Sequence, residues 1–327
     1  MSKEKELIKK YFTGLSDNKE SMRLNNDAAK IRSDKNHLVI SSDMMIENSH
    51  FYRKDNPKLL ARKLIRINLS DLAAMGAKPY GYFLNVAIPK VGASKWLGNF
   101  REGLRIDQKK FNIKLLGGDL SKSEKIFLSI TVLGKVKNKV HLLNSANVTS
   151  DLYVSGHIGD SAYGFLLENK KEFKKIRNKL DTKSINYLKN KFYLPKPKIN
   201  LGKSIIGYAD SCTDISDGLV SDLKKILLNS KLGAKIFVNK LPISKPVRLI
   251  YDLYENKRKF WDIILNWGED YELIFSMSME KKKKYEEKFN KLKNITKIGS
   301  LTSHKAITLL KNNNKKMILK TGGFSHF

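Results

Sequence analysis

Residues 57–75 have the sequence PKLLARKLIRINLSDLAAM, and this stretch is the clearest predicted element of the chain. A proline opens it, and Gly76 and then Pro79 end it, as expected of a helix. Residues three or four positions apart share one helical face: Leu60, Leu64, Ile67, Asp71 and Met75. Asp71 therefore points the same way as apolar residues, where an unpaired carboxylate is costly. It is either a buried acid satisfied by backbone amides or an arginine, or a metal ligand at the edge of a core, and the stripe alone does not decide.

Strand-like and helix-like segments alternate around this helix, which predicts a mixed α/β fold in two halves. Helices are predicted from Ser94, as an N-cap, to residue 111, from Gly159 onward, and over residues 217–229. Residues 135–147 are rich in lysine and asparagine and form the candidate linker. Strands are predicted at residues 37–40, 80–88, 113–116, 127–136, 151–155, 234–238 and 271–275.

The composition fits two domains of ordinary size, because the chain has 327 residues and is 41% hydrophobic. Its formal net charge of +31 raises the question of a nucleic-acid partner. The lysines are scattered along the whole chain among many asparagines and isoleucines, which favours the bias of an AT-rich genome. No helix-turn-helix, zinc-finger or RNP-type signature stands out, so no nucleic-acid partner is predicted.

The single cysteine, Cys212, excludes an internal disulfide framework and fits a reducing cytoplasm. The first residues lack the apolar segment of a signal peptide, and no apolar run approaches the roughly 18 residues that span a bilayer. The sequence therefore predicts a cytoplasmic protein without a membrane partner.

Carboxylates recur at predicted strand ends and helix starts, where each one alone is best explained as a turn former or a cap. Together they indicate one shared purpose, since Mg²⁺ prefers hard oxygen ligands and substrate phosphates. Glycines before one of them would let backbone amides approach a phosphate closely. Neither a Walker-type loop, a GxSxG elbow, an HExxH nor a CxxC motif competes with this interpretation. The acids are Asp27, Asp43, Asp71, Asp119, Asp214 and Asp217.

Several motifs resemble those of the thiamine-monophosphate kinase family, and they occur in order along the whole chain. The two most specific are NLSDLAAMGA at residues 68–77 and GEDYEL at residues 268–273. The others are Asn26-Asp27-Ala28-Ala29, Ser42-Asp43 with Glu47 and His50-Phe51, Gly117-Gly118-Asp119, Asp214-Ile215-Ser216-Asp217-Gly218-Leu219 and the terminal His326-Phe327.

This resemblance implies the two-domain fold shared with aminoimidazole ribonucleotide synthetase and selenophosphate synthetase. Residues 1–139 would bind ATP and Mg²⁺ and pair their sheet into a barrel across a homodimer. Residues 140–327 would complete the nucleotide and substrate site. The implied reaction moves the terminal phosphate of ATP onto thiamine monophosphate by direct in-line transfer assisted by Mg²⁺, so no catalytic nucleophile is expected.

The resemblance also assigns site residues by motif position. The implied ATP contacts are Gly118, Asp119 and Ser216, with Asn144 at the position of the family's arginine. The implied substrate contacts are His50, Glu269 and Phe324. The implied magnesium ligands are Asp27, Ser41, Ser42, Asp43, Asp71, Asp119, Asp214 and Asp217.

Two positions depart from the family pattern. Asn26 stands where the family usually has an acid, and Asn144 cannot pair with a phosphate as a charge, so Lys139 is a candidate substitute. Two other functions stay open: a related ATP-dependent enzyme of the same fold with a different acceptor, and a non-catalytic basic binding protein. Retention of the acids favours an enzyme, and GEDYEL together with the terminal His326-Phe327 favours the thiamine substrate.

Overall fold

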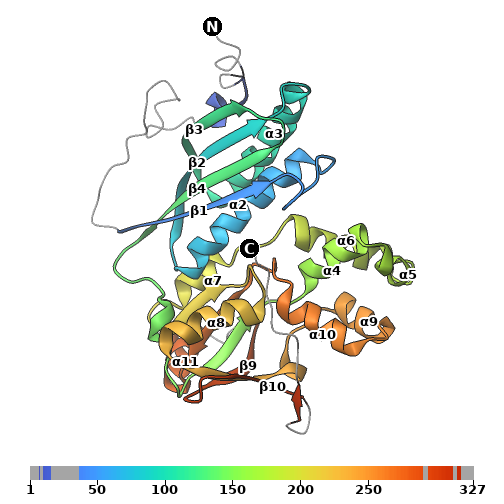
Figure 1. The fold of residues 1–327 in the computed structure, drawn as a ribbon. Helices are drawn as coiled ribbons and strands as arrows, with labels where there is room; N and C mark the ends of the chain where they lie inside the picture. The colour runs from blue at the N-terminus through green and yellow to red at the C-terminus, as the bar shows by residue number, and fades with distance from the viewer. Residues whose placement is uncertain (1–6, 8–9, 16–36, 290–293, 312–314, 318–327) are drawn as a thin grey trace. The chain divides into compact units, whose positions relative to one another are not determined.

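The computed structural model describes residues 7, 10–15, 37–289, 294–311 and 315–317. The chain forms two compact units, one made of Met1–Leu72 and Ala77–Asn138 and the other of Ala73–Gly76 and Lys139–Phe327. Each unit is described by itself (Figure 1). The roles predicted for residues 1–139 and 140–327 stay predictions.

The first unit is a four-stranded sheet of order β1-β4-β2-β3 with two long helices. Strand β4 runs antiparallel to both of its neighbours, and β2 and β3 are parallel. Burial alternates along β2 and β4, so one sheet face is covered and the other is partly exposed. The elements are β1 (His37–Ile46), α2 (Pro57–Ala74), β2 (Lys78–Ile88), α3 (Ala93–Phe111), β3 (Lys114–Lys122) and β4 (Phe127–Val136).

A buried ion pair fastens α2 to α3. The guanidinium of Arg66 donates to both carboxylate oxygens of Asp107, at 2.5 and 3.0 Å, and Arg62 adds a third contact at 3.2 Å. The side chains of Arg66 and Asp107 are 2% and 0% exposed. Because each charge satisfies the other away from water, this pair fixes how the two helices pack.

The second unit contains a seven-stranded mixed sheet of order β11-β10-β7-β9-β5-β8-β6. Alternate residues of its central strands enter two different cores: Leu152 and Val154 of β5 enter one, and Tyr153 enters the other. The sheet is therefore covered on both faces. The strands are β5 (Asp151–Ser155), β6 (Ser211–Asp214), β7 (Gly233–Phe237), β8 (Leu273–Met277), β9 (Ile295–Thr302), β10 (Ile307–Leu310) and β11 (Lys316–Met317).

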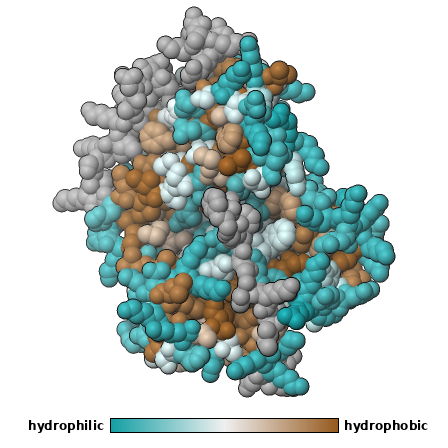
Figure 2. Space-filling model, in the orientation of Figure 1, coloured by the Kyte–Doolittle hydropathy of each residue, from teal (hydrophilic) through white to brown (hydrophobic). Residues whose placement is uncertain are grey.

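Helices α4, α6, α8, α9 and α10 contribute to the larger of these cores, and α7 and α11 contribute to the smaller one. Figure 2 shows that α4, α5, α6 and α9 present a largely hydrophilic outer surface. The helices are α4 (Asp160–Asn169), α5 (Lys174–Arg177), α6 (Thr182–Tyr193), α7 (Ile199–Ser204), α8 (Leu219–Ser230), α9 (Lys245–Leu253), α10 (Lys257–Asn266) and α11 (Met279–Phe289). Among the described residues, no helix is both long enough and apolar enough to cross a membrane.

The predicted mixed α/β fold is confirmed, with four local corrections. Asp43 and Asp119 lie inside β1 and β3 and not after them, because both strands continue through polar residues at the sheet edges. Ser94 is not an N-cap: Gly92 precedes α3 in a left-handed conformation, and the Ser94 hydroxyl bonds to Tyr11 instead. Asp217 lies before α8, which begins at Leu219. Strand β8 begins at Leu273, two residues later than predicted.

Truncating Asp107 should destabilise the first unit strongly. In Asp107→Ala, Arg66 stays buried without its carboxylate, so the free energy of unfolding should fall by about 3–5 kcal/mol. Glu102→Ala is the matched control on the same helix, because its exposed pairs with Arg101 and Arg105 contribute about 0–1 kcal/mol. Urea unfolding followed by circular dichroism compares the two. Equal losses in both variants would contradict this account of the pair.

Candidate functional site

The covered face of the first sheet brings together three of the predicted magnesium ligands. The Ser41 hydroxyl donates to the Asp71 carboxylate of α2 at 2.5 Å. Asp43 lies two residues further along β1, opposite the fully buried Ile130, so it shares this face. Asp71 is half-buried, as expected for an acid at the edge of an apolar stripe. Hydroxyl and carboxylate oxygens of this kind fit Mg²⁺.

Ser42 and Asp119 lie on the opposite, partly exposed face. The Ser42 hydroxyl bonds to Thr131 at 2.9 Å, and Asp119 accepts from Ser121 at 2.7 Å. Their strands, β1 and β3, are the two edges of the sheet and are separated by β4 and β2. At about 4.8 Å per strand, the two edges are roughly 14 Å apart. Within one unit, therefore, the predicted ligands divide into separate groups.

Gly118 is required by the sheet itself. A Cβ at this position would lie 1.8 Å from the carbonyl oxygen of Leu84 on β2. The close packing of β3 on β2 therefore explains this glycine before any phosphate is considered.

The loop after β1 fixes the ring of His50. The backbone N–H of Ile46 donates to His50 Nδ1 at 3.0 Å. In the neutral ring the proton then sits on Nε2, so this bond fixes the tautomer of His50. Glu47 holds the same loop: it accepts from Arg53 at 2.6 and 2.9 Å and from the backbone N–H of Ile126 at 2.9 Å. These donors lower the pKa of Glu47, although burial opposes them.

In the second unit, two predicted site segments lie side by side. The backbone N–H of Glu269, a predicted substrate contact, donates to the carbonyl of Ser216, a predicted ATP contact, at 2.8 Å. Asp214 ends β6 and is 6% exposed. The motifs DISDG and GEDYEL, which are 50 residues apart in sequence, thus form one locality. This juxtaposition is what a site joining nucleotide and acceptor requires.

Sequence reasoning missed Asp222 and Lys225. Asp222 is fully buried at the start of α8 and accepts from the backbone N–H groups of residues 216, 217 and 218. Lys225 donates to Asp217 at 2.8 Å and contacts Asp222 at 2.7 Å. Burial raises the pKa of Asp222. The sequence does contain a pattern that indicates Asp222. Like Asp71, it shares one helical face with apolar residues, in this case Leu219, Leu223 and Ile226.

A second missed network surrounds the GEDYEL segment. Glu272 accepts from Ser155 at 2.5 Å and from Lys198 at 2.8 Å, and burial raises the pKa of this carboxyl. Asp270 accepts from the backbone N–H of Gly159, and burial raises its pKa well above the ordinary range. The contacts of Asp270 and Glu272 attach this segment to the rest of the unit, and Glu269 beside them is half-buried.

Asn144 is exposed on a 3-10 turn, Leu143–Ser145. The Ser230 hydroxyl of α8 donates to the carbonyl of Leu143 in this turn at 2.8 Å.

Cys212 is buried, and burial raises the pKa of its thiol, so the thiol is protonated and inert at neutral pH.

Some predicted site residues lie outside the part of the chain that the structure describes. They are Asp27 with its neighbour Asn26, Phe324, and the terminal His326 and Phe327. Across the described parts of the chain, no group of three His, Cys, Asp or Glu side chains could hold a metal ion. The metal-ligand roles therefore stay predictions, supported in the first unit by the oxygen donors around Asp71.

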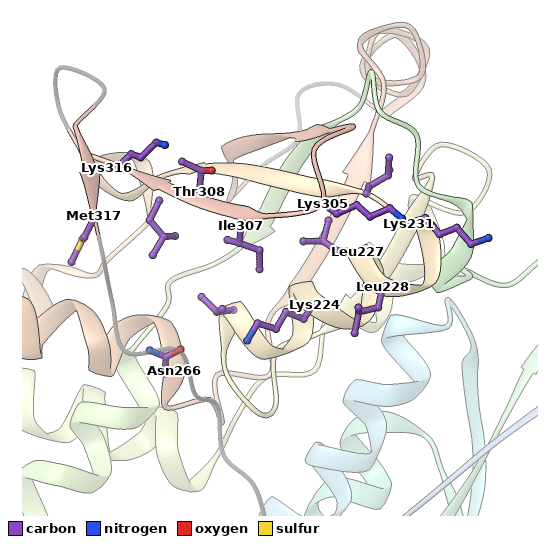
Figure 3. A pocket seen from close by; sticks show the side chains of 13 residues that line it. Lys224, Leu227, Leu228, Lys231, Asn266, Lys305, Ile307, Thr308, Lys316 and Met317 are labelled. Atoms are coloured by element: carbon purple, nitrogen blue, oxygen red, sulfur yellow. The ribbon is translucent and has the colours of Figure 1, made fainter.

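A cavity of about 700 Å³ lies in the second unit between α8 and strands β10 and β11 (Figure 3). Its walls combine apolar residues such as Leu227 and Ile307 with four lysines. None of the predicted site residues lines it, although Val220 and Asn266 in its wall lie two residues from Gly218 and Gly268 of the motif loops. The lysines are Lys224, Lys231, Lys305 and Lys316.

Comparison with known proteins matches both halves of the chain. Residues 25–136 match the family described as AIR synthase related protein, N-terminal domain, and residues 151–311 match AIR synthase related protein, C-terminal domain. The chain is 38% identical over 328 residues to the thiamine-monophosphate kinase of Buchnera aphidicola subsp. Schizaphis graminum, and the match covers 98% of each chain.

Two solved structures are similar across nearly the whole chain. One is thiamine-monophosphate kinase from Stenotrophomonas maltophilia, with 25% identity, a TM-score of 0.78 and coverage of 93% of this chain and 94% of the other. The second is AaThiL complexed with AMPPCP and TMP, with 26% identity, a TM-score of 0.77 and coverage of 92% and 91%.

The Glu47 contacts predict a dependence of stability on pH. The folded pKa of Glu47 lies below its ordinary value of 4.5, so its contribution to stability is present above pH 4.5 and is lost as pH falls through the folded pKa. Glu47→Gln should be less stable than wild type at neutral pH and should lose less stability on going from neutral pH into that acidic range. Thermal melts between these pH values measure the difference.

Glu280→Gln is the control, because Lys284 lowers the pKa of Glu280 in an exposed helical pair. Salt at about 1 M should remove the Glu280 effect by screening. The Glu47 effect should persist, since the backbone N–H of Ile126 also contributes. If salt abolished both effects equally, the loop contacts of Glu47 would not be responsible.

Proposed function

This chain belongs to the AIR synthase-related family and, within it, to the thiamine-monophosphate kinases, and we propose that it transfers phosphate directly and in line with the assistance of Mg²⁺. The enzyme phosphorylates thiamine monophosphate to thiamine diphosphate with ATP as co-substrate. The observation that carries this function is similarity to a thiamine-monophosphate kinase over 98% of both chains, which includes both motif loops. The AaThiL complex holds AMPPCP and TMP, which supports the same pair of substrates here.

The main obstacle to the reaction is repulsion between two anionic phosphates. Mg²⁺ would neutralise phosphate oxygens and align donor with acceptor. In the first unit Ser41, Asp43 and Asp71 would hold it, and in the second Asp214 and Asp217 offer further carboxylates. Asp27, Ser42 and Asp119 complete the proposed ligand set.

The chain's own donors position the substrates. His50 would contact the acceptor, and the hydrogen bond from the N–H of Ile46 to Nδ1 places the proton of its neutral ring on Nε2. Ser216 and Glu269, joined through the backbone, would place the nucleotide and the acceptor beside each other. Gly118 and Asp119 would contact the nucleotide, and Phe324 would offer an aromatic face to thiamine. No covalent intermediate is needed, because attack by the acceptor phosphate on ATP is direct.

A homodimer joined through the first unit is part of the proposal. The open face of its sheet exposes three large apolar side chains of β1: Leu38, Ile40 and Met44, at 44%, 61% and 50%. Apolar residues gathered on an exposed edge strand favour association. Closing the sheet against that of a second copy would bury them and would bring the edges that carry Ser42 and Asp119 next to strands of that copy.

We place the enzyme in the cytoplasm, where ATP is available and Cys212 stays reduced.

The activity assay is direct. Purified protein with ATP, Mg²⁺ and thiamine monophosphate should form thiamine diphosphate and adenosine diphosphate in equal amounts, as measured by chromatography. Omission of the acceptor or chelation of Mg²⁺ should stop both. Equal release of adenosine diphosphate without thiamine monophosphate would show that the acceptor is wrong.

Neutralising Asp43 separates a metal-ligand role from a structural one. Asp43→Asn should abolish phosphate transfer and leave the ligand-free protein as stable as wild type or more stable, because a charge beside Asp71 is removed. The rise in melting temperature caused by Mg²⁺ with nucleotide should also be lost. Glu124→Gln, an exposed acid of the same unit, should keep activity and the rise. A destabilised Asp43→Asn that still turns over would exclude Asp43 as a ligand.

A further inference from the structure

The two motif loops of the second unit are joined by three backbone hydrogen bonds. Glu269 N–H donates to the Ser216 carbonyl at 2.8 Å, Tyr271 N–H donates to the Ile215 carbonyl at 2.9 Å, and the N–H of Ile215 donates to the Glu272 carbonyl at 2.8 Å. Gly268 makes this approach possible, since a Cβ there would lie 2.2 Å from the Ser216 oxygen and its φ is +86°. These three bonds connect residues 214–218 directly to residues 268–272.

Asp222 anchors the first of these loops. One of its oxygens, Oδ2, accepts from three successive backbone N–H groups, at 2.9, 3.0 and 3.2 Å for Ser216, Asp217 and Gly218. The other oxygen contacts Lys225. The side chain is 0% exposed, so these donors alone replace water around the carboxylate. Their directions fix the course of the loop.

Asp270 anchors the second loop from its other side. Both of its oxygens accept from the N–H of Gly159, at 3.0 and 2.8 Å, and Oδ1 accepts from Ser161 at 3.4 Å, at the start of α4. The residues on either side, Glu269 and Tyr271, have φ values of +58° and +50°, in the left-handed region that side chains rarely adopt. Such a conformation persists only where its surroundings hold it, and Asp270 supplies that hold.

We propose that Asp222 and Asp270 are positioning residues that lock the nucleotide loop and the acceptor loop into one rigid body, so that the two substrate sites are energetically coupled. Asp222 acts on the loop with Ser216, and Asp270 acts on the loop with Glu269. The three backbone bonds carry a displacement of either loop to the other. The kinetic part of this proposal rests on the proposed function, whereas the structural part does not.

If the two loops are coupled, each anchor should affect both substrates. Loss of the anchor under one loop should disturb the substrate held by the other loop, because a coupling free energy acts in both directions. Asp222→Ala should therefore raise KM for thiamine monophosphate as well as for ATP, and Asp270→Ala should do the same.

The decisive experiment measures hydrogen exchange by mass spectrometry in peptides covering residues 213–219 and 266–273. In Asp270→Ala, both peptides should exchange faster, on the order of fivefold to tenfold, the net effect of losing about one ordinary hydrogen bond. Asp222→Ala should also affect both. The conservative variants Asp222→Asn and Asp270→Asn keep an acceptor oxygen and should restore most of the protection and both KM values.

Asp181→Ala is the matched control, since Asp181 accepts from Ser184 N–H at 2.8 Å and caps α6 in the same unit. It should leave both peptides and both KM values unchanged. Faster exchange confined to residues 266–273 in Asp270→Ala, and to 213–219 in Asp222→Ala, would overturn the coupling. If wild type failed to phosphorylate thiamine monophosphate, the function would fall, while the exchange result would still decide the rigid-body inference.

Discussion

A buried carboxylate must find hydrogen-bond donors, and in this protein backbone N–H groups supply many of them. Asp222 gathers the amides of one motif loop, and Asp270 takes the amide of Gly159 at the start of α4. Glu47 in the first unit uses the amide of Ile126 in the same way. Because an unsatisfied buried acid is costly, each of these contacts fixes the course of a chain segment and not only a side chain. Ser216, Glu269 and His50 belong to segments held in this manner.

The basic composition supplies the remaining partners. The chain has 63 lysines and arginines against 32 acids, yet the acids are the groups around which its interior polar contacts form. Asp160 is 1% exposed and contacts Lys191 at 3.2 Å, and Lys198 contacts the buried Glu272. Burial of such a charge is tolerated when a cation and further donors meet it. Part of the positive charge thus serves the interior of the second unit, and it cannot all be counted as surface available to a partner.

Local pattern in the sequence was sufficient for most elements and for the side of the helix on which Asp71 lies. Periodicity placed α2, β4 and β5 within a residue of their observed bounds, because their apolar residues repeat regularly. It failed at β1 and β3, which continue pairing through polar residues, since backbone pairing does not depend on apolar side chains. Period-two alternation does not indicate which strands lie at the edges of a sheet. The distance between Ser42 on β1 and Asp119 on β3 could therefore not be predicted from the sequence. Asp222 could have been predicted as a buried acid, because it shares a helical face with apolar residues.

The separation of the acids bears on how the first unit tolerates them. Two carboxylates 4 Å apart repel by about 4 kcal/mol at the effective dielectric near a protein surface. Convergence of Asp43, Asp71 and Asp119, as the sequence suggested, would multiply that repulsion. The sheet avoids it by placing Asp119 on the opposite face and the far edge, and Ser41 donates a hydrogen bond to Asp71 beside Asp43. Of these three acids, only Asp43 and Asp71 share a face of the sheet within this unit. Release of strain on neutralising an acid should therefore be small and specific to that pair, and a large gain in stability would have to arise from contacts beyond the unit.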